Sequence, residues 1–333
     1  MPSSAPLRIG ILGAAKIAPM ALLRPARSVP QVVISAVAAR DPERAREFAA
    51  RHSIPRVHAS YDDLIADADL DAIYNPLPNG LHCDWAVRAL EAGKDVLCEK
   101  PLASNAAEAE RMAAVATRTG RMLMEAFHWR YHALAPRLKE IVDGGALGTV
   151  RHLEAHMCVP LPSASDIRYR YDLAGGAAMD VGCYTISLLR FLAGAEPEVT
   201  RASAILRGPQ IDRYMEAEFR FPDGRTARMT CSLFSIVLLR LSAKVRGDRG
   251  EMRVLNPYLP QFGHRVTLRT DAGVARERVR GDGTYVAQLR AFVEACRTRV
   301  PPPTDAAHGV ANMRVIDAVY RAAGLAVRGD QQI

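Results

Sequence analysis

The sequence predicts an α/β protein in which a doubly wound parallel sheet is followed by an α+β region with a large, mostly antiparallel sheet. Short β-rich runs alternate with amphipathic helical stretches from residue 7 to about 125, the pattern of parallel strands joined by crossover helices. Beyond residue 148, strand-like segments follow one another with few helices between them, as in antiparallel sheets. We therefore expect one domain at 1–125 and a second at 126–333.

Length and composition fit a globular protein of two domains. The 333 residues are about twice the usual domain length, and 49% are hydrophobic. No apolar stretch reaches the roughly 18 residues of a membrane helix and no basic signal segment opens the chain, so we expect a cytoplasmic protein without membrane contact. The charge of +8 is spread along the chain, which argues against nucleic acid. Six cysteines without a C-x-x-C pair predict reduced thiols and no metal site.

The individual elements follow from apolar runs and from the residues that interrupt them. In the first half, strands are expected near 7–12, 32–38, 56–58, 71–75, 95–99 and 121–124. In the second half, strands are expected near 148–158, 196–207, 214–221, 226–234, 238–246, 251–255 and 264–270. Helices are expected at about 130–144, 181–193, 284–298 and 307–327.

The first predicted strand ends in a turn that suits a dinucleotide. Gly13 permits a tight turn after the apolar run, and in dinucleotide-binding folds the pyrophosphate rests on the helix N-terminus that follows. Ala15 and Ala18 stand where the strict fingerprint has glycine, and an ordinary strand-to-helix loop is the alternative for this turn taken alone. The residues expected to bind the cofactor here are Gly13, Ala14, Ala15, Lys16 and Ile17.

The second predicted strand ends in Arg40 and Asp41, where such folds recognise the adenine ribose. Arg40 comes first after the strand, and a guanidinium binds a 2′-phosphate with paired hydrogen bonds where a carboxylate would repel it. We therefore expect NADP(H), with NAD(H) as the alternative. The structural alternatives are an exposed loop arginine for Arg40 and a helix N-cap for Asp41.

Two more loops follow parallel strands, at the sheet edge where open α/β sheets bind ligands. The fifth strand ends in Glu99-Lys100-Pro101, which places Lys100 beside the nucleotide site. The loop after the fourth strand is pinned by prolines, and the residues expected to border the nicotinamide or ribose are Asn75, Pro76, Leu77, Asn79 and His82. The structural alternatives are a cap for Asn79, a first-turn helix residue for His82 and a charged strand end for Lys100.

A further constellation combines Gly175-Gly176 with Asp180 and Tyr184. The last two residues are spaced i, i+4 at a helix start, so their side chains share one face. A tyrosine becomes an acid/base near neutral pH when a cation lowers its pKa, and Lys100 is the candidate cation. The alternative is a capping role for Asp180 and a core position for Tyr184.

These segments, in this order, resemble the Gfo/Idh/MocA family of nicotinamide-dependent oxidoreductases, especially the branch of dihydrodiol dehydrogenases, D-xylose dehydrogenases and glucose-fructose oxidoreductase. The similarity covers nearly the whole chain, and its specific segments are Ile9 to Ala18, Ala38 to Pro42, Ala92 to Pro101, Met124 to Tyr131, and Gly175 to Tyr184. The resemblance implies a Rossmann first domain. It also implies that Lys100 and Tyr184 form the catalytic pair, that Asp180 helps to hold substrate and that Glu99 borders the cofactor.

The same resemblance implies a pocket and an association surface. Pocket residues would be Arg130, Asp166, Arg168 and Tyr169, with surface positions as the alternative. Many relatives carry histidine where this chain has Tyr184, a difference that favours the sugar and diol branch over the inositol branch. The second sheet would keep one face open for homodimers or homotetramers, and the helix at 307–327 would pack back on the first domain.

The expected function is an NADP(H)-dependent oxidoreductase that moves hydride between nicotinamide and a sugar, polyol or cyclic diol. Tyr184 would remove the hydroxyl proton while Lys100 lowers the pKa of the phenol. One alternative is an NADP-binding sensor or scaffold without turnover, because a fold does not guarantee chemistry. Another is a glycosidase that uses a tightly held NAD on this fold.

Overall fold

The computed structural model describes residues 5–163 and 165–329, which form two units. One unit contains Tyr131 and the residues before it, together with Tyr285–Val310. The other contains His132–Thr284 and the residues from Ala311 onward. The segment Tyr285–Val310 thus joins the first unit, although it lies within the sequence range expected for the second domain.

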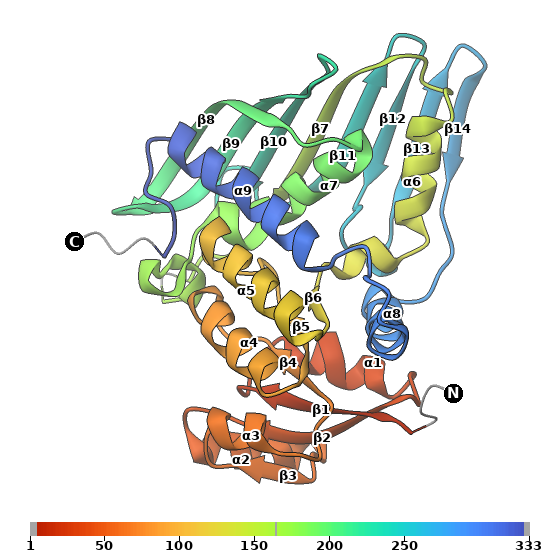
Figure 1. Cartoon of the computed structure of the whole chain (residues 1–333). Coiled ribbons are helices and arrows are strands. Elements are labelled where there is room, and N and C mark those ends of the chain that lie inside the picture. Colours follow the sequence, from red (N-terminus) through yellow and green to blue (C-terminus); the bar gives the residue numbers. More distant parts are fainter. Residues whose placement is uncertain (1–4, 164, 330–333) are drawn as a thin grey trace. The chain divides into compact units, whose positions relative to one another are not determined.

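The first unit is built on a six-stranded parallel sheet with the strand order β3-β2-β1-β4-β5-β6 (Figure 1). The strands are β1 (Leu7–Leu12), β2 (Val32–Ala38), β3 (Arg56–His58), β4 (Ala72–Asn75), β5 (Asp95–Cys98) and β6 (Leu123–Glu125). This order confirms the predicted doubly wound Rossmann sheet. It reverses between β1 and β4, and ligands bind such sheets at that point, beyond the carboxyl ends of the strands.

Helices pack on this sheet through their apolar faces. They are η1 (Pro19–Leu23), α1 (Arg24–Ala26), α2 (Pro42–His52), α3 (Tyr61–Ala66), η2 (Asn79–Leu81), α4 (His82–Glu91), α5 (Ala106–Thr119), η3 (His128–Tyr131) and α8 (Thr284–Thr298). Leu289 and Phe292 of α8 share a core with Ile9 and Val37. This burial explains why a helix from late in the chain belongs to the first unit.

The second unit is built on an eight-stranded sheet with the order β14-β13-β12-β11-β7-β10-β9-β8. The strands are β7 (Val150–Cys158), β8 (Glu198–Gly208), β9 (Ile211–Arg220), β10 (Thr226–Ser232), β11 (Arg240–Gly247), β12 (Gly250–Leu255), β13 (Arg265–Thr270) and β14 (Gly273–Glu277). The β7–β10 pair is parallel and the other described neighbours are antiparallel, which confirms the predicted class. The sequence did not predict β14.

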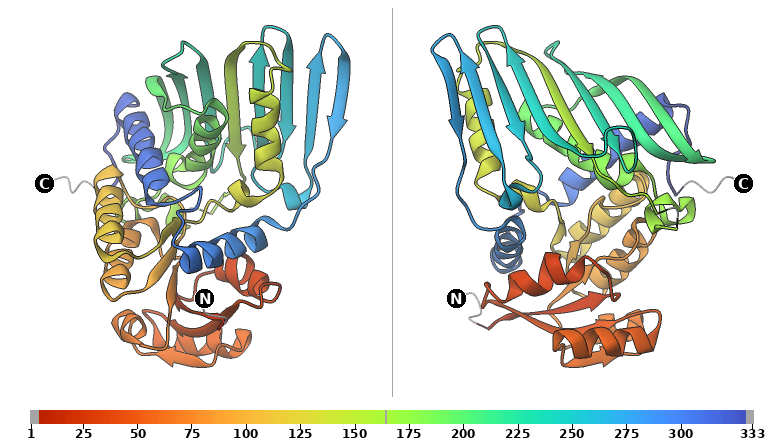
Figure 2. Two further views of the ribbon diagram at one scale, coloured as in Figure 1. Left: turned by 45° about the vertical axis from the view of Figure 1, so that its right-hand side comes forward. Right: turned by 180° about the vertical axis from the view of Figure 1, so that it is seen from behind.

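Helices cover one face of this sheet. The helical segments are α6 (Leu134–Asp143), η4 (Ile167–Tyr169), η5 (Tyr171–Leu173), η6 (Ala178–Gly182), α7 (Cys183–Ala193), η7 (Pro260–Phe262) and α9 (Ala306–Ala322). In the view from behind, the strands face the viewer, and α6, α7 and the part of α9 in this unit lie behind them (Figure 2). The sheet face turned away from these helices is therefore open. Met215, Ala217 and Phe219 of β9 point toward the helices and are buried, whereas Glu216 and Glu218 alternate with them on the open face. Within the described ranges, no helix combines the length and apolar character needed to cross a bilayer.

Candidate active site

The turn after β1 has the geometry expected for a dinucleotide. The amide of Gly13 donates to the carbonyl oxygen of Ala38 at 2.6 Å, which ties the turn to the end of β2. Gly13 has φ +89°, and a Cβ there would lie 3.0 Å from the side chain of Leu77. A glycine is therefore required at this position. The first helical element, η1, begins at Pro19, and its N-cap Ala18 already has helical φ and ψ, so Ala14 to Ile17 form a turn ahead of the helix rather than the expected helix start.

Two arginines lie beside this turn. Arg40 is exposed directly after β2, and Arg44 donates to the carbonyl oxygen of Ala14 at 3.0 Å. Burial raises the pKa of the Tyr61 phenol, and the nearby Arg40 and Arg44 oppose that rise. Arg44 was not among the predicted cofactor-binding residues, although it lies in the first turn of the helix that follows Arg40 and Asp41. Asp41 is the N-cap of α2, since its carboxylate accepts from the amides of Glu43 and Arg44.

The buried side chain of His82 holds the proline-rich loop after β4 through a backbone contact. Its Nε2 lies 2.7 Å from the carbonyl oxygen of Leu77, and its Nδ1 lies 2.9 Å from that of Pro101. Asn75 adds a hydrogen bond from its amide nitrogen to the carbonyl oxygen of His82 and accepts one from the amide of Leu77. His82, Asn75, Pro76 and Leu77 are buried, whereas Asn79 is half-buried. The loop and the turn after β5 are thus joined through one imidazole.

Lys100 is half-buried at the carboxyl end of β5, and both of its flanks are fixed. Glu99 accepts a hydrogen bond of 2.7 Å from the Tyr74 hydroxyl. The amide of Leu102 donates to the buried carboxylate of Glu125 at 2.8 Å. The other oxygen of Glu125 lies 3.2 Å from Nδ1 of His308. The sequence predicted no role for Glu125, and its burial together with the hydrogen bond from Leu102 shows that it anchors this turn.

In the second unit, Asp180 and Tyr184 lie on consecutive turns of η6 and α7. Asp180 pairs with Nε of Arg168 at 3.0 Å, and this pairing raises the pKa of Arg168. Tyr184 is 6% exposed, and its ring lies 5.9 Å from that of Tyr258. The sequence predicted a helix from about 181, but a π-helical turn, a form frequent at functional sites, starts it at Ala178.

The other predicted pocket residues have different surroundings. Asp166 accepts from Nη1 of Arg168 at 3.1 Å, so the cluster of Asp166, Arg168 and Asp180 is continuous. Tyr169 donates its hydroxyl hydrogen to the carbonyl oxygen of Leu161, and the guanidinium of Arg207 lies 4.3 Å above its ring. Arg130 lies on η3 of the first unit, 5.5 Å from the ring of Trp129.

Comparison with known proteins identifies the family. Residues 7–127 match the oxidoreductase family with an NAD-binding Rossmann fold, and residues 136–253 match the GFO/IDH/MocA C-terminal domain. D-xylose 1-dehydrogenase (NADP(+)) 2 of Haloferax volcanii is 36% identical over 97% of this chain and 100% of its own length. The chain belongs to the Gfo/Idh/MocA family. It is an NAD(P)-dependent dehydrogenase or reductase of the group that acts on sugars and diols.

Other similar proteins share the fold over nearly their full length. A dTDP-3,4-didehydro-2,6-dideoxy-alpha-D-glucose 3-reductase of Streptomyces violaceoruber is 34% identical over 96% of this chain and 96% of its own. KijD10, a 3-ketoreductase from Actinomadura kijaniata in complex with NADP and TDP-benzene, has a TM-score of 0.89 at 28% identity, covering 95% of this chain and 98% of that one. Aldose-aldose oxidoreductase from Caulobacter crescentus has a TM-score of 0.88 at 27% identity, covering 96% and 98%.

The residues of this Gfo/Idh/MocA protein fit a nicotinamide dinucleotide. Gly13 has a positive φ that side-chain-bearing residues rarely adopt, and the guanidinium groups of Arg40 and Arg44 lie at the strand end where the adenine ribose is recognised. The Lys100 turn lies two strands away, beyond the switch point between β1 and β4. The first unit therefore has groups for both ends of such a cofactor.

Proposed function

We propose that this protein is an NADP(H)-dependent oxidoreductase that transfers hydride between the nicotinamide and a carbon bearing a hydroxyl or carbonyl group in a sugar, polyol or cyclic diol. The observation that carries this proposal is the fixed Lys100 turn, anchored by Tyr74 through Glu99 and by Glu125 through Leu102. The half-burial of Lys100 between two fixed neighbours at the end of β5 supports a chemical role for this lysine.

Tyr184 is the proposed acid/base. The nicotinamide, when bound, supplies or accepts the hydride. Tyr184 removes the hydroxyl proton in oxidation and returns it in reduction, and the Lys100 ammonium favours the ionised phenol. Asp180, held by Arg168 at 3.0 Å, orients a substrate hydroxyl, and Arg130, Arg168 and Tyr169 line the substrate site. Glu99 and the Asn75-to-His82 loop border the cofactor.

The preference for NADP(H) rests on charge at the end of β2. Asp41 uses its carboxylate as the N-cap of α2, whereas Arg40 is exposed and Arg44 is held against the turn after β1. Two guanidinium groups at this point favour a 2′-phosphate, since each can donate paired hydrogen bonds to it. The similar D-xylose dehydrogenase carries NADP(+) in its name, and KijD10 was solved with NADP, which supports the proposal.

A substrate screen tests this function. The purified protein is mixed with NADP(+) or NAD(+) and aldoses, polyols or trans-dihydrodiols, and with NADPH and keto sugars, while nicotinamide absorbance is followed. We expect turnover with at least one hydroxyl or keto substrate and faster turnover with the phosphorylated cofactor. NADP binding without an absorbance change for any substrate would favour the sensor. Cleavage of glycosides without net cofactor consumption would favour the glycosidase.

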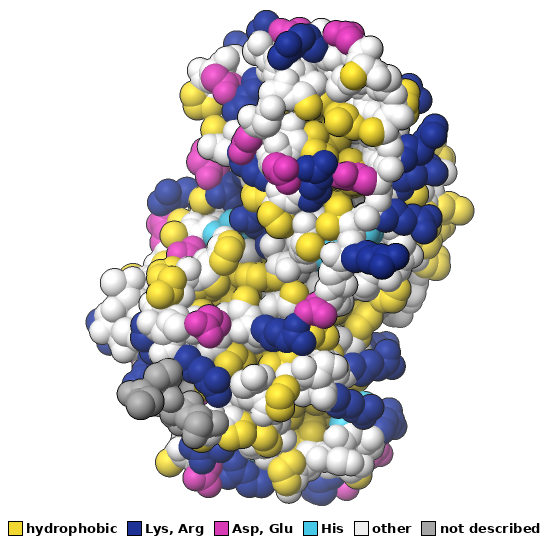
Figure 3. Space-filling view, turned by 90° about the vertical axis from the view of Figure 1, so that its right-hand side faces the viewer, with side chains coloured by type: hydrophobic (Ala, Val, Ile, Leu, Met, Phe, Trp, Pro, Cys, Tyr) yellow, Lys and Arg dark blue, Asp and Glu magenta, His cyan; other side chains and the backbone are white. Residues whose placement is uncertain are grey.

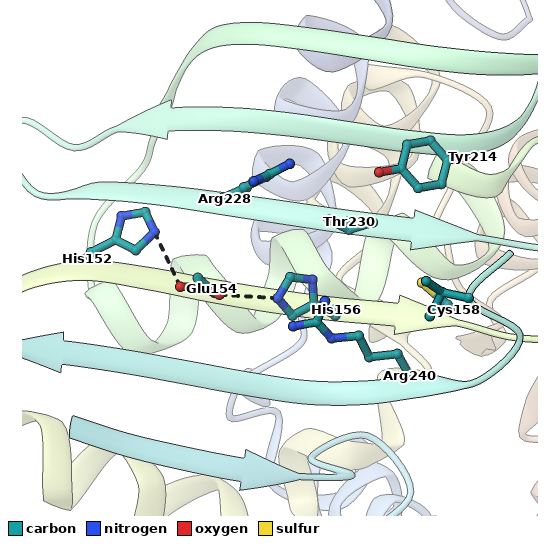
Figure 4. Close-up of a pocket in the computed structure, with 9 residues that line it drawn as sticks. His152, Glu154, His156, Cys158, Tyr214, Arg228, Thr230 and Arg240 are labelled. Carbon is teal, nitrogen blue, oxygen red and sulfur yellow. Dashed lines mark hydrogen bonds and ion pairs between the residues drawn. The ribbon is translucent and has the colours of Figure 1, made fainter. Parts of the chain in front are cut away.

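We also propose that the open face of the eight-stranded sheet pairs with a second copy of the chain. A hollow of about 300 Å³ on this face contains His156, whose buried Nδ1 has no hydrogen-bond partner among the described residues (Figure 4). The hollow is lined by His152, Glu154, His156, Cys158, Tyr214, Arg228, Thr230, Val237 and Arg240. An unpaired buried nitrogen is costly, and a surface that covers the hollow could satisfy it.

Exposed apolar residues and two-fold symmetry favour a copy of the same chain as that surface. The side of the molecule toward β14 shows more Lys and Arg than Asp and Glu (Figure 3), and the adjoining hollow contains Arg253, Arg265, Arg269 and Arg276. Glu216 and Glu218 lie on β9, toward the other edge of the sheet. Glu216 pairs with Arg228 at 2.7 Å, so this carboxylate is already matched within the chain. A two-fold axis would set the open face of one copy against the same face of the other.

The loop between β10 and β11 adds apolar area to this proposed interface. Its exposed residues are Phe234, Ile236, Val237, Leu238 and Leu239. We expect a dimer or tetramer by analytical ultracentrifugation, and dissociation on substitution of Ile236→Asp. The control is Val300→Asp, which makes the same kind of apolar-to-charged change at an exposed position of the first unit and should leave the mass of the assembly unchanged. A wild-type monomer at micromolar concentration would overturn the association.

A further inference from the structure

A fully buried ion pair lies behind the segment that begins η6. Nη2 of Arg328 lies 2.8 Å from Oδ1 of Asp212, and neither side chain is exposed. Asp212 belongs to β9, whereas Arg328 follows α9 near the end of the described chain. Burying two charges costs free energy unless further hydrogen bonds satisfy them, so the remaining partners of this pair indicate what it does.

Those partners include two backbone groups of one turn. Oδ2 of Asp212 accepts a hydrogen bond of 2.7 Å from the amide of Ala178, and Nε of Arg328 donates one of 2.7 Å to the carbonyl oxygen of Gly175. Tyr320 supports the pair by donating its hydroxyl hydrogen to Oδ1 of Asp212 at 3.0 Å. The ion pair therefore hydrogen-bonds the backbone at two points, Gly175 just before η6 and Ala178 at its start.

The same contacts explain why the turn contains two glycines. A Cβ on Gly176, which has φ +132°, would lie 2.1 Å from Oδ1 of Asp212. A Cβ on Gly175 would lie 2.5 Å from the carbonyl oxygen of Arg168. The amide of Gly176 donates to that carbonyl oxygen at 2.8 Å, and the guanidinium of Arg168 pairs with Asp180. The turn is thus enclosed by the buried pair and by the Arg168 segment.

We propose that Asp212 and Arg328 are positioning residues, which fix the backbone of Gly175–Ala178 and so set the orientation in which Asp180 and Tyr184 are presented. The role assigned to Tyr184 rests on the proposed function. The N-cap position, Ala177, has no side chain able to accept a hydrogen bond, so the amides of the first turn need another acceptor. The carboxylate of Asp212 supplies it from a neighbouring strand.

The experiment compares variants of this pair with a buried arginine at the far end of α7. The test variants are Arg328→Met and Asp212→Asn, and Arg328→Lys is the conservative variant. The matched control is Arg190→Met, since Arg190 is 8% exposed and pairs with Glu196 at 2.6 Å. For each variant we measure kcat, KM, NADP affinity, melting temperature and the pH dependence of kcat.

A positioning role predicts a specific pattern. In R328M and D212N, kcat should fall about 10- to 100-fold, because small displacements of reacting groups have large effects. In the pH profile of kcat, the apparent pKa assigned to Tyr184 should move to a higher value. NADP affinity should stay within about twofold of wild type, because the proposed cofactor-binding groups lie in the first unit. R328K should recover most of kcat. R190M should lower the melting temperature without moving this apparent pKa.

A second readout does not need turnover. Hydrogen–deuterium exchange of the amides at 175–184 should rise in R328M and stay at the wild-type level in R190M. If R328M does not fold, Tyr320→Phe, which removes one donor to Asp212, should give a smaller effect in the same direction. Wild-type exchange at these amides, or wild-type kcat and pH profile in a destabilised R328M, overturns the inference. A wild-type protein without turnover overturns the proposed function instead, and the exchange data then decide the positioning role.

Discussion

Nδ1 of the His82 imidazole lies 2.9 Å from the carbonyl oxygen of Pro101, so a buried side chain joins the loop after β4 to the turn that carries Lys100. Its Nε2 lies 2.7 Å from the carbonyl oxygen of Leu77. A neutral imidazole has one N–H to donate, so only the protonated ring can donate to both oxygens. Burial nevertheless lowers the pKa of His82 to about 4, and Lys100 adds to this effect. At neutral pH the ring is therefore neutral and only one of the two contacts carries a hydrogen.

Replacing His82 should disturb both loops at once. In His82→Ala, two buried carbonyl oxygens lose their contact with the ring, and we expect a loss of about 1–3 kcal/mol in the free energy of unfolding. NADP affinity and kcat should both fall, because without the His82 ring the loop after β4 and the Lys100 turn are no longer joined. Urea unfolding and NADP titration measure these effects. His58→Ala, which removes a half-buried histidine at the edge strand β3, should leave NADP affinity unchanged.

Buried histidines predict a loss of stability in mild acid. Burial lowers the pKa of His82 and His156 to about 4 and that of His128 to about 3. In the unfolded chain these rings bind protons near pH 6.5, so stability is complete above that value and falls as pH drops toward 4. The Glu251 pKa is lowered from 4.5 to about 2, so its contribution is present above 4.5 and is lost as pH falls from there toward 2.

The measurement is the free energy of unfolding in urea at pH 7.5, 6.0 and 5.0. We expect a progressive decrease, and a shallower one in His128→Gln, whose side chain does not titrate. Equal slopes in wild type and variant would show that His128 is not one of the groups that take up protons on unfolding.

Much of this fold follows from local pattern, whereas the site does not. The predicted helix at 284–298 matches α8, and the strand endings placed Gly13, Arg40 and Lys100 at one edge of the parallel sheet. The assignment of α8 to the first unit depends on which core buries Leu289 and Phe292, and periodicity shows only that a face is apolar, not which sheet covers it.

The roles of the residues that support the site could not be predicted from the sequence either. Glu125, Asp212 and Arg328 act through hydrogen bonds to residues far away in the chain, and no spacing rule connects such positions. Arg44 is closer at hand, since it lies in the first turn of the helix that begins directly after Arg40 and Asp41. The Gly175-Gly176 pair was visible as a motif, but its cause is the closeness of Asp212 and Arg168, which only the coordinates show.

The two arginines beyond β2 should determine cofactor preference. In Arg40→Ala, KM for NADP(+) should rise about 10- to 100-fold, the loss of a charge-assisted pair, while KM for NAD(+) changes less than about threefold. Arg44→Leu should act in the same direction and also free the carbonyl oxygen of Ala14. Arg46→Ala is the control, because Arg46 is exposed on the same helix and pairs with Glu43. Equal changes for both cofactors in R40A would contradict recognition of a 2′-phosphate.

Lys100 and Tyr184 should behave as one catalytic unit. Lys100→Met and Tyr184→Phe should each lower kcat about 10²- to 10⁴-fold, the usual contribution of general acid–base catalysis, with NADP binding largely kept in Y184F. If the ammonium acts by lowering the pKa of the phenol, it has nothing to act on once the phenol is gone. The double variant should therefore be scarcely slower than the slower single variant. Steady-state kinetics of the four proteins, with NADPH binding measured by the fluorescence of its reduced nicotinamide, test this non-additivity. Losses that multiply in the double variant would show that the two residues contribute independently and that Lys100 does not work through Tyr184.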